Sequence, residues 1–369
     1  MLLKTFRWPL GLTVLVLFLA ALIGGIPALA LVAILGILEI SLSFDNAVVN
    51  AKVLARMSPL WQRLFLTIGI VIAVFGMRLV FPLLVVAISA KLNPVETVDL
   101  ALKGGDGPGS YAAILAQAHP QIAAFGGMFL LSLFLDWVLE DREIQWLSWL
   151  ERPLARIGKL DVLSTVIAMV TLICVAMTIA PDTGTIMVAG TLGLVTYQLV
   201  NGLGELFESA GDQRGSAVFL FLYLEVIDAS FSFDGVVGAF AVTQNIFLIA
   251  AGLGIGAMYI RSMTVYLVRK GTLSEYVYLE HGAHWAIGSL AVVLLLSMRY
   301  HVPEVVTGLI GVGFIGWAFA VSVTRNRRGR KAPSGQTGAH ESIAVTRPRP
   351  PVREGNPDDN RSRQGAGHR

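Results

Sequence analysis

Long runs of apolar residues, separated by short polar segments, dominate the hydrophobicity pattern of the chain. About ten of these runs are long enough to cross ~30 Å of hydrocarbon as α-helices. Their approximate ranges are 8–25, 28–56, 62–90, 121–140, 161–180, 185–203, 217–242, 246–268, 279–298 and 303–324. The pattern therefore predicts an all-α, polytopic membrane protein with about ten transmembrane helices.

The composition supports this class and excludes an ordinary soluble domain. Hydrophobic residues make up 55% of the 369 positions and charged residues only 14%, whereas soluble domains contain about a quarter charged residues. The single cysteine, Cys174, lies in an apolar run, so the chain forms neither an internal disulfide nor a cage of thiolates. Any metal must therefore be held mainly by oxygen or imidazole ligands.

Two nearly matching motifs place acidic residues inside the predicted transmembrane helices. Residues 39–46 read Glu-Ile-Ser-Leu-Ser-Phe-Asp-Asn, and residues 228–235 read Asp-Ala-Ser-Phe-Ser-Phe-Asp-Gly. A carboxylate in the hydrocarbon region costs at least about 2.5 kcal/mol, so a pattern that repeats this cost indicates a site rather than ordinary packing. The second and seventh predicted helices run in opposite directions. The motifs therefore indicate an inverted-topology repeat, whose substrate site lies near the membrane midplane.

Helical periodicity groups the motif residues into polar stripes. The stripes consist of Glu39, Ser43, Asn46 and Asn50 in the first helix, and of Glu225, Asp228 and Ser232 in the second. Asp45 and Asp234 lie about 100° away from the stripes on a straight helix. They would join the same site if the helices unwind at the Ser-Phe-Asp segments, which are poor helix formers. Unwound backbone would then add carbonyl ligands.

An antiparallel crossing of the two motif helices would bring their carboxylates together. Such an oxygen-rich site suits a hard divalent cation such as Mn²⁺, Mg²⁺ or Ca²⁺. The expected metal ligands are Glu39, Asp45, Asn46, Glu225, Asp228 and Asp234, with Ser43 and Ser232 in support. Because four motif carboxylates exceed the charge of one divalent ion, we expect some to be protonated in the empty site, which would couple metal movement to protons.

Other polar residues within the apolar runs have two readings each. Arg78 and Arg261 follow the two motif helices; they would balance charge in the empty site or form gates, or else pair with the acids as static links. Asp136 is either a ligand from a third helix or an interfacial acid. His281 and His284 share one helix face, as a metal pair requires, and an interfacial role is the alternative.

The loops set the orientation, because the predicted inner loops carry most of the Lys and Arg residues. Both termini are therefore expected in the cytoplasm, in a multi-pass protein of the inner (plasma) membrane. The expected parts are a first, uncleaved transmembrane helix at 1–27, a first repeat half with an outer loop and an inner amphipathic segment at 28–160, a second repeat half at 161–324, and a disordered basic cytoplasmic tail at 325–369. The tail is read as a topology anchor, not as a nucleic-acid binder.

The first motif, extended to Leu38-Glu-Ile-Ser-Leu-Ser-Phe-Asp-Asn-Ala47, resembles the motif of the TerC family of integral membrane proteins. Within that family the chain looks closest to a branch long labelled only as a domain of unknown function, which the Glu280-His-Gly-Ala-His-Trp stretch also resembles. The resemblance implies a relation to the LysE-type transporter superfamily, inverted helical repeats and a role in manganese export. By position it points to Glu39, Asp45, Asn46, Asp228 and Asp234. Gly235 departs from the family, where Asn is common.

The sequence therefore predicts a transporter of divalent cations, with manganese export by alternating access through a midplane carboxylate site. It predicts no enzymatic activity and no prosthetic group. Its expected partners are membrane lipid, the transported cation and protons as the coupling ion, while the sequence sets no oligomeric state. Two alternatives remain open: an intramembrane metalloenzyme that uses His281 and His284, and a membrane scaffold of a metal or tellurite stress-response complex.

Overall fold

The computed structural model describes residues 2–331, apart from 106, 143, 159–161, 210–212, 272–274 and 301, and every regular element in that part is a helix. The elements of the first half are α1 (Leu2–Leu42), α2 (Phe44–Ala55), α3 (Pro59–Val71), the π-helix η1 (Ile72–Val80), α4 (Phe81–Ala90), α5 (Pro94–Lys103), α6 (Tyr111–Leu139) and α7 (Ser148–Ile157). Those of the second half are α8 (Leu163–Thr178), α9 (Thr183–Ser209), α10 (Gln213–Val242), α11 (Ile246–Lys270), α13 (Leu279–Ser297) and α14 (Glu304–Lys331).

In the part of the chain that the structure describes, seven helical segments are long and apolar enough to cross a membrane, which confirms the multi-pass membrane class. They are Thr5–Ser41, Pro59–Ala90, Tyr111–Leu139, Thr183–Leu203, Ile246–Lys270, Leu279–Ser297 and Val306–Arg327. Neither α10, which carries the second motif, nor the shorter apolar α8 is among them. The ten crossings and the inverted repeat therefore stay predictions. The last helix continues to Lys331, past the boundary expected at 324, and the rest of the expected tail lies outside the described residues.

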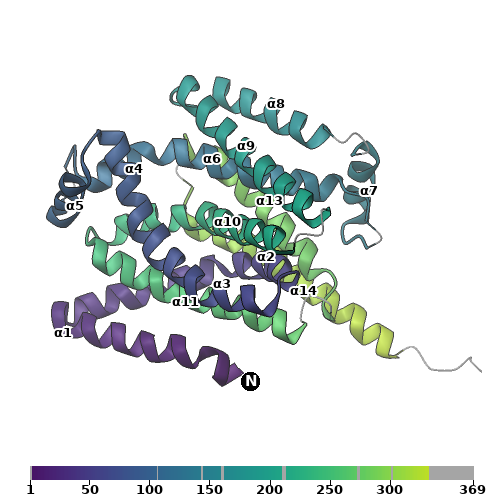
Figure 1. The fold of residues 1–369 in the computed structure, drawn as a ribbon, viewed down its shortest axis with the longest axis horizontal. Helices are drawn as coiled ribbons and strands as arrows, with labels where there is room; N and C mark the ends of the chain where they lie inside the picture. The colour runs from purple at the N-terminus through teal and green to yellow at the C-terminus, as the bar shows by residue number, and fades with distance from the viewer. Residues whose placement is uncertain are drawn as a thin grey trace, which may run out of the picture. The chain divides into compact units, whose positions relative to one another are not determined.

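The first helix is divided where the sequence predicted two separate crossings. Gly25 has φ 68° and ψ −165°, a conformation that glycine adopts without strain, and α1 folds back on itself there (Figure 1). Both arms contact α11. In the first arm the ring of Phe6 stacks on Tyr259 with centroids 6.0 Å apart, and in the second Leu35 packs against Gly252.

A row of glycines lets these helices approach α11 closely. A Cβ atom at Gly252 would lie 2.5 Å from Cβ of Leu35, and one at Gly256 would lie 2.3 Å from Cγ of Glu39. At Gly254 it would meet Val74 of η1 at 3.0 Å. The spacing of these glycines therefore serves helix packing, as the apolar context predicts, and it lets Glu39 lie directly against α11.

The other large packing unit surrounds α6. Its middle is buried against α9, α10 and α13, and the residues that it shares with them include Met128, Phe129, Ile227, Ile287 and Leu294. The expected amphipathic segment near α6 is present as α7, which exposes Trp149 and buries Glu151 and Ala155. α2 lies between these two packing units, because it contacts α11 of the first unit and both α10 and α13 of the second.

Candidate functional site

The two motifs differ in local structure. In the first, the helix is interrupted at Ser43, which has φ −100° and ψ 18° and separates α1 from α2. The interruption is narrow, because the Ser43 N–H still donates to the Glu39 carbonyl at 3.0 Å. In the second, α10 runs through the whole motif without a break. The expected unwinding is thus limited to one residue of the first motif. In the second motif the backbone stays helical, so the expected local unwinding is absent from α10.

The motif helices cross in antiparallel directions. Asn46 donates from Nδ2 to Oδ1 of Asp228 at 2.7 Å. At the other end of the crossing, a Cβ atom on Gly235 would lie 3.1 Å from Oε2 of Glu39. Position 46 thus meets 228 and position 39 meets 235. When the motifs are aligned, Glu39 corresponds to Asp228 and Asn46 to Gly235, so the same two motif positions meet at both ends.

Two buried arginines bind the motif acids. Arg78 of η1 forms an ion pair with Glu39 and donates from Nη1 to the carbonyl of Ala73 at 2.6 Å. Arg261 of α11 donates to both oxygens of Glu225 at 2.9 and 3.0 Å and to Oδ2 of Asp228 at 3.0 Å. All are nearly inaccessible, with Arg261 only 1% exposed. Such paired, hydrogen-bonded burial is the form in which charges are tolerated inside a protein.

The arginines also need space that small or flat neighbours provide. A Cβ atom on Gly69 would lie 2.6 Å from Nη1 of Arg261, so α3 approaches the guanidinium only because position 69 lacks a side chain. The ring of Phe65, one turn earlier, lies 4.1 Å from the guanidinium carbon, a cation–π contact. Sequence reasoning identified Arg261 but neither of these two supports.

The expected four-carboxylate site stays a prediction. Within the described residues, no group of three or more His, Cys, Asp or Glu side chains could hold a metal ion, and Glu39 binds a different arginine from Glu225 and Asp228. The side chains of Asp45 and Asp234 lie outside the described part of the chain. Three described carboxylates face two guanidinium groups, which leaves a formal charge of one negative. The supporting residue Ser232 is buried, while Ser43 makes no capping hydrogen bond with its side chain.

Apolar clusters lie on both sides of this polar layer. One consists of Leu54, Met57, Phe65, Leu224 and Val265, and the other includes Leu35, Val86, Val236, Phe240 and Leu253. The layer itself consists of Glu39, Asn46, Asn50, Arg78, Glu225, Asp228 and Arg261, all at most 8% exposed. The described side chains of this polar layer are therefore buried between two apolar clusters.

The remaining expected site residues lie elsewhere. Asp136 accepts a hydrogen bond from the hydroxyl of Tyr197 at 2.6 Å, which joins α6 to α9. His281 and His284 contact different protein groups, as the interfacial role predicts. Nε2 of His281 lies 2.9 Å from the carbonyl oxygen of Ile144, and the ring of His284 stacks on Trp137 with centroids 4.4 Å apart. Their shared face was expected, but they use it to pack against the aromatic end of α6.

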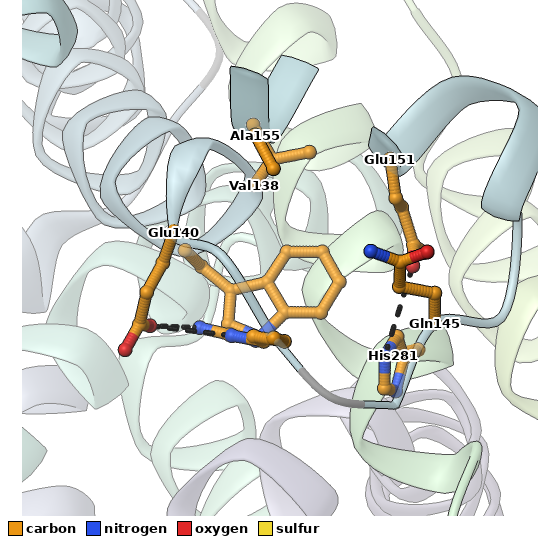
Figure 2. A pocket seen from close by; sticks show the side chains of 8 residues that line it. Val138, Glu140, Gln145, Glu151, Ala155 and His281 are labelled. Atoms are coloured by element: carbon orange, nitrogen blue, oxygen red, sulfur yellow. Dashed lines mark hydrogen bonds and ion pairs between the residues drawn. The ribbon is translucent and has the colours of Figure 1, made fainter. Parts of the chain in front are cut away.

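Figure 2 shows the small cavity beside these histidines, where Glu151 and His281 face each other. Glu151 accepts hydrogen bonds from the backbone N–H groups of Trp146 and Leu147, at 3.0 and 3.3 Å, and so orders the segment that begins α7. Its Oε2 lies 3.8 Å from Nε2 of His281. The cavity therefore belongs to the docking of α7, away from the crossing.

A partly exposed ion network lies near the C-terminal end of α2, where Lys52 is located. Lys52 pairs with Glu280 at 2.5 Å, and Arg142 lies 3.8 Å from the same carboxylate while it covers the Trp137 ring at 4.5 Å. Sequence reasoning missed this network. Lys52 could have indicated it, because a lysine in an apolar helix requires a partner of opposite charge.

The comparisons with known proteins concern the family alone. Residues 44–329 match the model of a family described as "Protein of unknown function (DUF475)", so the match begins inside the first motif and reaches into α14. No curated protein and no solved structure matches the chain in these comparisons. The match does not test the resemblance to TerC proteins. Because it covers far more than half of the sequence, the chain belongs to the DUF475 family.

Proposed function

We propose that this protein transports a divalent metal cation across the membrane by alternating access at the crossing of the two motifs, where the junction of α1 and α2 meets α10. The carrying observation is the buried antiparallel contact in which Asn46 meets Asp228 and Glu39 meets Gly235. An ion path requires polar groups within the membrane together with barriers on both sides. The arrangement supports the proposal because polar ligand types lie between two apolar clusters.

In this proposal the two arginines form ion pairs with the acids while no cation is bound. Guanidinium groups neutralise buried carboxylates without a metal, and a divalent cation that entered the layer would compete with Arg78 for Glu39 and with Arg261 for Asp228. The formal charge of one negative favours cation entry. Mn²⁺ is the expected substrate, exported from the cytoplasm, since amide and carboxylate oxygens suit hard divalent ions.

Proton coupling follows from the same charges. A cation that leaves the layer exposes carboxylates, which either return to the arginines or take up protons. We therefore expect an imposed pH gradient to change the rate of metal movement. A rate indifferent to that gradient would argue against protons as the coupling ion while leaving metal transport intact.

The test is accumulation of ⁵⁴Mn²⁺ by everted membrane vesicles. We expect uptake with the wild-type protein and its loss in the double variant Glu39→Gln, Asp228→Asn, which keeps the size of both side chains. Asp99→Asn is the matched control, because Asp99 is an exposed acid that pairs with Lys103 on the surface of α5. Equal uptake by the wild type and the double variant would refute a path through the crossing.

A static role for the ion pairs makes the opposite prediction. If Arg78 and Arg261 only link helices, neutralising their acids reduces stability and leaves any ion movement unchanged. Measuring the melting temperature of each variant alongside uptake therefore separates the two readings.

A further inference from the structure

Asn50 is a buried side chain whose polar atoms have no partner. It is 0% exposed, and in the described part of the chain neither Nδ2 nor Oδ1 forms a hydrogen bond. Burying an amide without a hydrogen bond is unfavourable, and native proteins leave few such groups. An amide in this state requires an explanation beyond packing.

Its place on α2 points toward the crossing. Asn50 follows Asn46 by one helical turn and therefore shares its face, and Asn46 holds Asp228. The next turn brings Leu54, which belongs to the apolar cluster with Leu224 and Val265. The unpartnered amide thus lies between the acids and the apolar barrier on one side of the polar layer.

The packing of the crossing does not require an amide at this position. When the motifs are aligned, Asn50 corresponds to Ala239 in α10, and Ala239 is likewise buried, at 2% exposure. The second motif helix therefore packs with a methyl group where the first has an amide. The amide is specific to the side of the layer that leads to Arg56 and Arg63, which the sequence predicts to be cytoplasmic.

We propose that Oδ1 of Asn50 binds the cation as it passes between the acids at the crossing and the cytoplasmic side, so that the amide lacks a partner only while the path is empty. An amide oxygen is a good ligand for hard divalent cations. The amide is uncharged, so its oxygen would replace a water ligand of the cation but bind the cation less tightly than a carboxylate does. This inference rests on the proposed transport function and adds a binding position to it.

The test compares stability with transport in Asn50→Leu. Leucine has nearly the shape of asparagine, and replacing an unpartnered buried amide by an apolar group removes an unfavourable burial. We therefore expect the melting temperature of the purified protein to rise by about 2 °C or more. In everted vesicles the same variant should lose most of its ⁵⁴Mn²⁺ uptake, while Asn50→Asp, which keeps an oxygen ligand but holds the cation more tightly, should retain part of it.

Tyr111→Phe is the matched control. The hydroxyl of Tyr111 is another buried polar atom without a partner in the described part of the chain, but it lies in the apolar cluster on the other side of the layer. Its removal should leave uptake unchanged. If Asn50→Leu does not fold, Asn50→Ala, which copies the residue at position 239, takes its place in the comparison.

The outcomes separate the two proposals. Loss of uptake in a protein that is at least as stable as the wild type supports a role for Asn50 in the path. Wild-type uptake by Asn50→Leu overturns it, and so does a loss of uptake that accompanies a lower melting temperature in both Asn50→Leu and Asn50→Ala, because the amide would then be structural. A wild-type protein that takes up no Mn²⁺, Ca²⁺ or Mg²⁺ overturns the transport function itself.

Discussion

The two motifs have nearly the same sequence but different electrostatic surroundings. Glu39 has one arginine, Arg78, which lies in the π-helix η1. Asp228 shares Arg261 with Glu225 and also accepts a hydrogen bond from Asn46. Counting only the side chains that the structure describes, the first site is therefore formally neutral, while the second keeps a negative charge. A repeated motif thus fixes where the acids lie, and the neighbouring helices decide which arginine each acid binds.

The helices that carry the two arginines differ in regularity. Arg261 lies in a regular helix that is capped at both ends, by the Asn245 side chain and by Gly271 with φ 64°, whereas Arg78 lies in a π-helical stretch. Short π-helical segments are rare and occur often at functional sites. We infer that the Arg78 side of the crossing is the one more easily rearranged, and the Arg261 side the more rigid.

The largest expected difference between the halves is the loss of each arginine. Arg261→Met leaves two buried carboxylates without their cation, and we expect it to lower the free energy of unfolding by about 3–5 kcal/mol. Arg78→Met leaves one and should cost less. Thermal unfolding in detergent measures both, and Arg261→Met combined with Glu225→Gln and Asp228→Asn should recover part of the loss. A larger loss for Arg78→Met than for Arg261→Met would contradict the comparison.

Asn46→Ala tests the hydrogen bond by which Asn46 joins the first motif to Asp228 of the second. The variant removes the donor to Oδ1 of Asp228, and a hydrogen bond to a charged group is worth about 1.5–3 kcal/mol. We expect a loss of stability in that range, measured by denaturation. The loss should shrink in the presence of Asp228→Asn, which removes the charge, and two additive losses would show that the contact contributes nothing.

Gly256→Ala tests how closely Glu39 lies against α11. The new methyl group would overlap Cγ of Glu39, and overpacking of this kind costs typically 1–3 kcal/mol. Gly316→Ala is the control, because a Cβ atom there meets no other atom within 4 Å and alanine favours the helix. Unfolding temperatures measure both. Equal stability of the two variants would mean that Glu39 is not held by α11.

The smallest expected effect comes from making the halves more alike. Gly235→Asn places an amide beside Glu39, as Asn46 is placed beside Asp228, and the close carboxylate oxygen must shift by a few tenths of an ångström. We expect stability to change by less than about 1 kcal/mol, since asparagine also suits a helix better than glycine. In the swapped pair Asn46→Gly, Gly235→Asn, stability should exceed that of Asn46→Gly alone. A large loss in Gly235→Asn would show that the two ends of the crossing are not equivalent.

The helical class and the crossing follow from the sequence more readily than the contacts of each acid. Apolar runs predict membrane helices, and the helical spacing of Glu39 and Asn46 predicts that both face the partner helix. The close packing of the α11 glycines also follows from the sequence, because they lie in an apolar run without a preceding strand. All three features depend only on the local sequence pattern.

Tertiary packing decides what the sequence pattern leaves open. An arginine side chain reaches several ångströms, so its position in the sequence does not tell which acid it binds, and the sharing of Arg261 by two acids was not predicted. The π-helix around Arg78 was not predicted either, because a period of 3.6 residues describes its apolar pattern equally well. His281 and His284 share a face in both interpretations, and only the position of Trp137 shows that they pack against an aromatic ring.

The most direct test of the account is Mn²⁺ binding to the purified protein, measured by isothermal titration calorimetry for the wild type and for the Glu39→Gln, Asp228→Asn double variant. If a cation competes with the arginines for these two acids, we expect saturable binding to the wild type and none to a correctly folded double variant. Equal binding to both proteins would contradict it, because the cation would then be held away from the crossing.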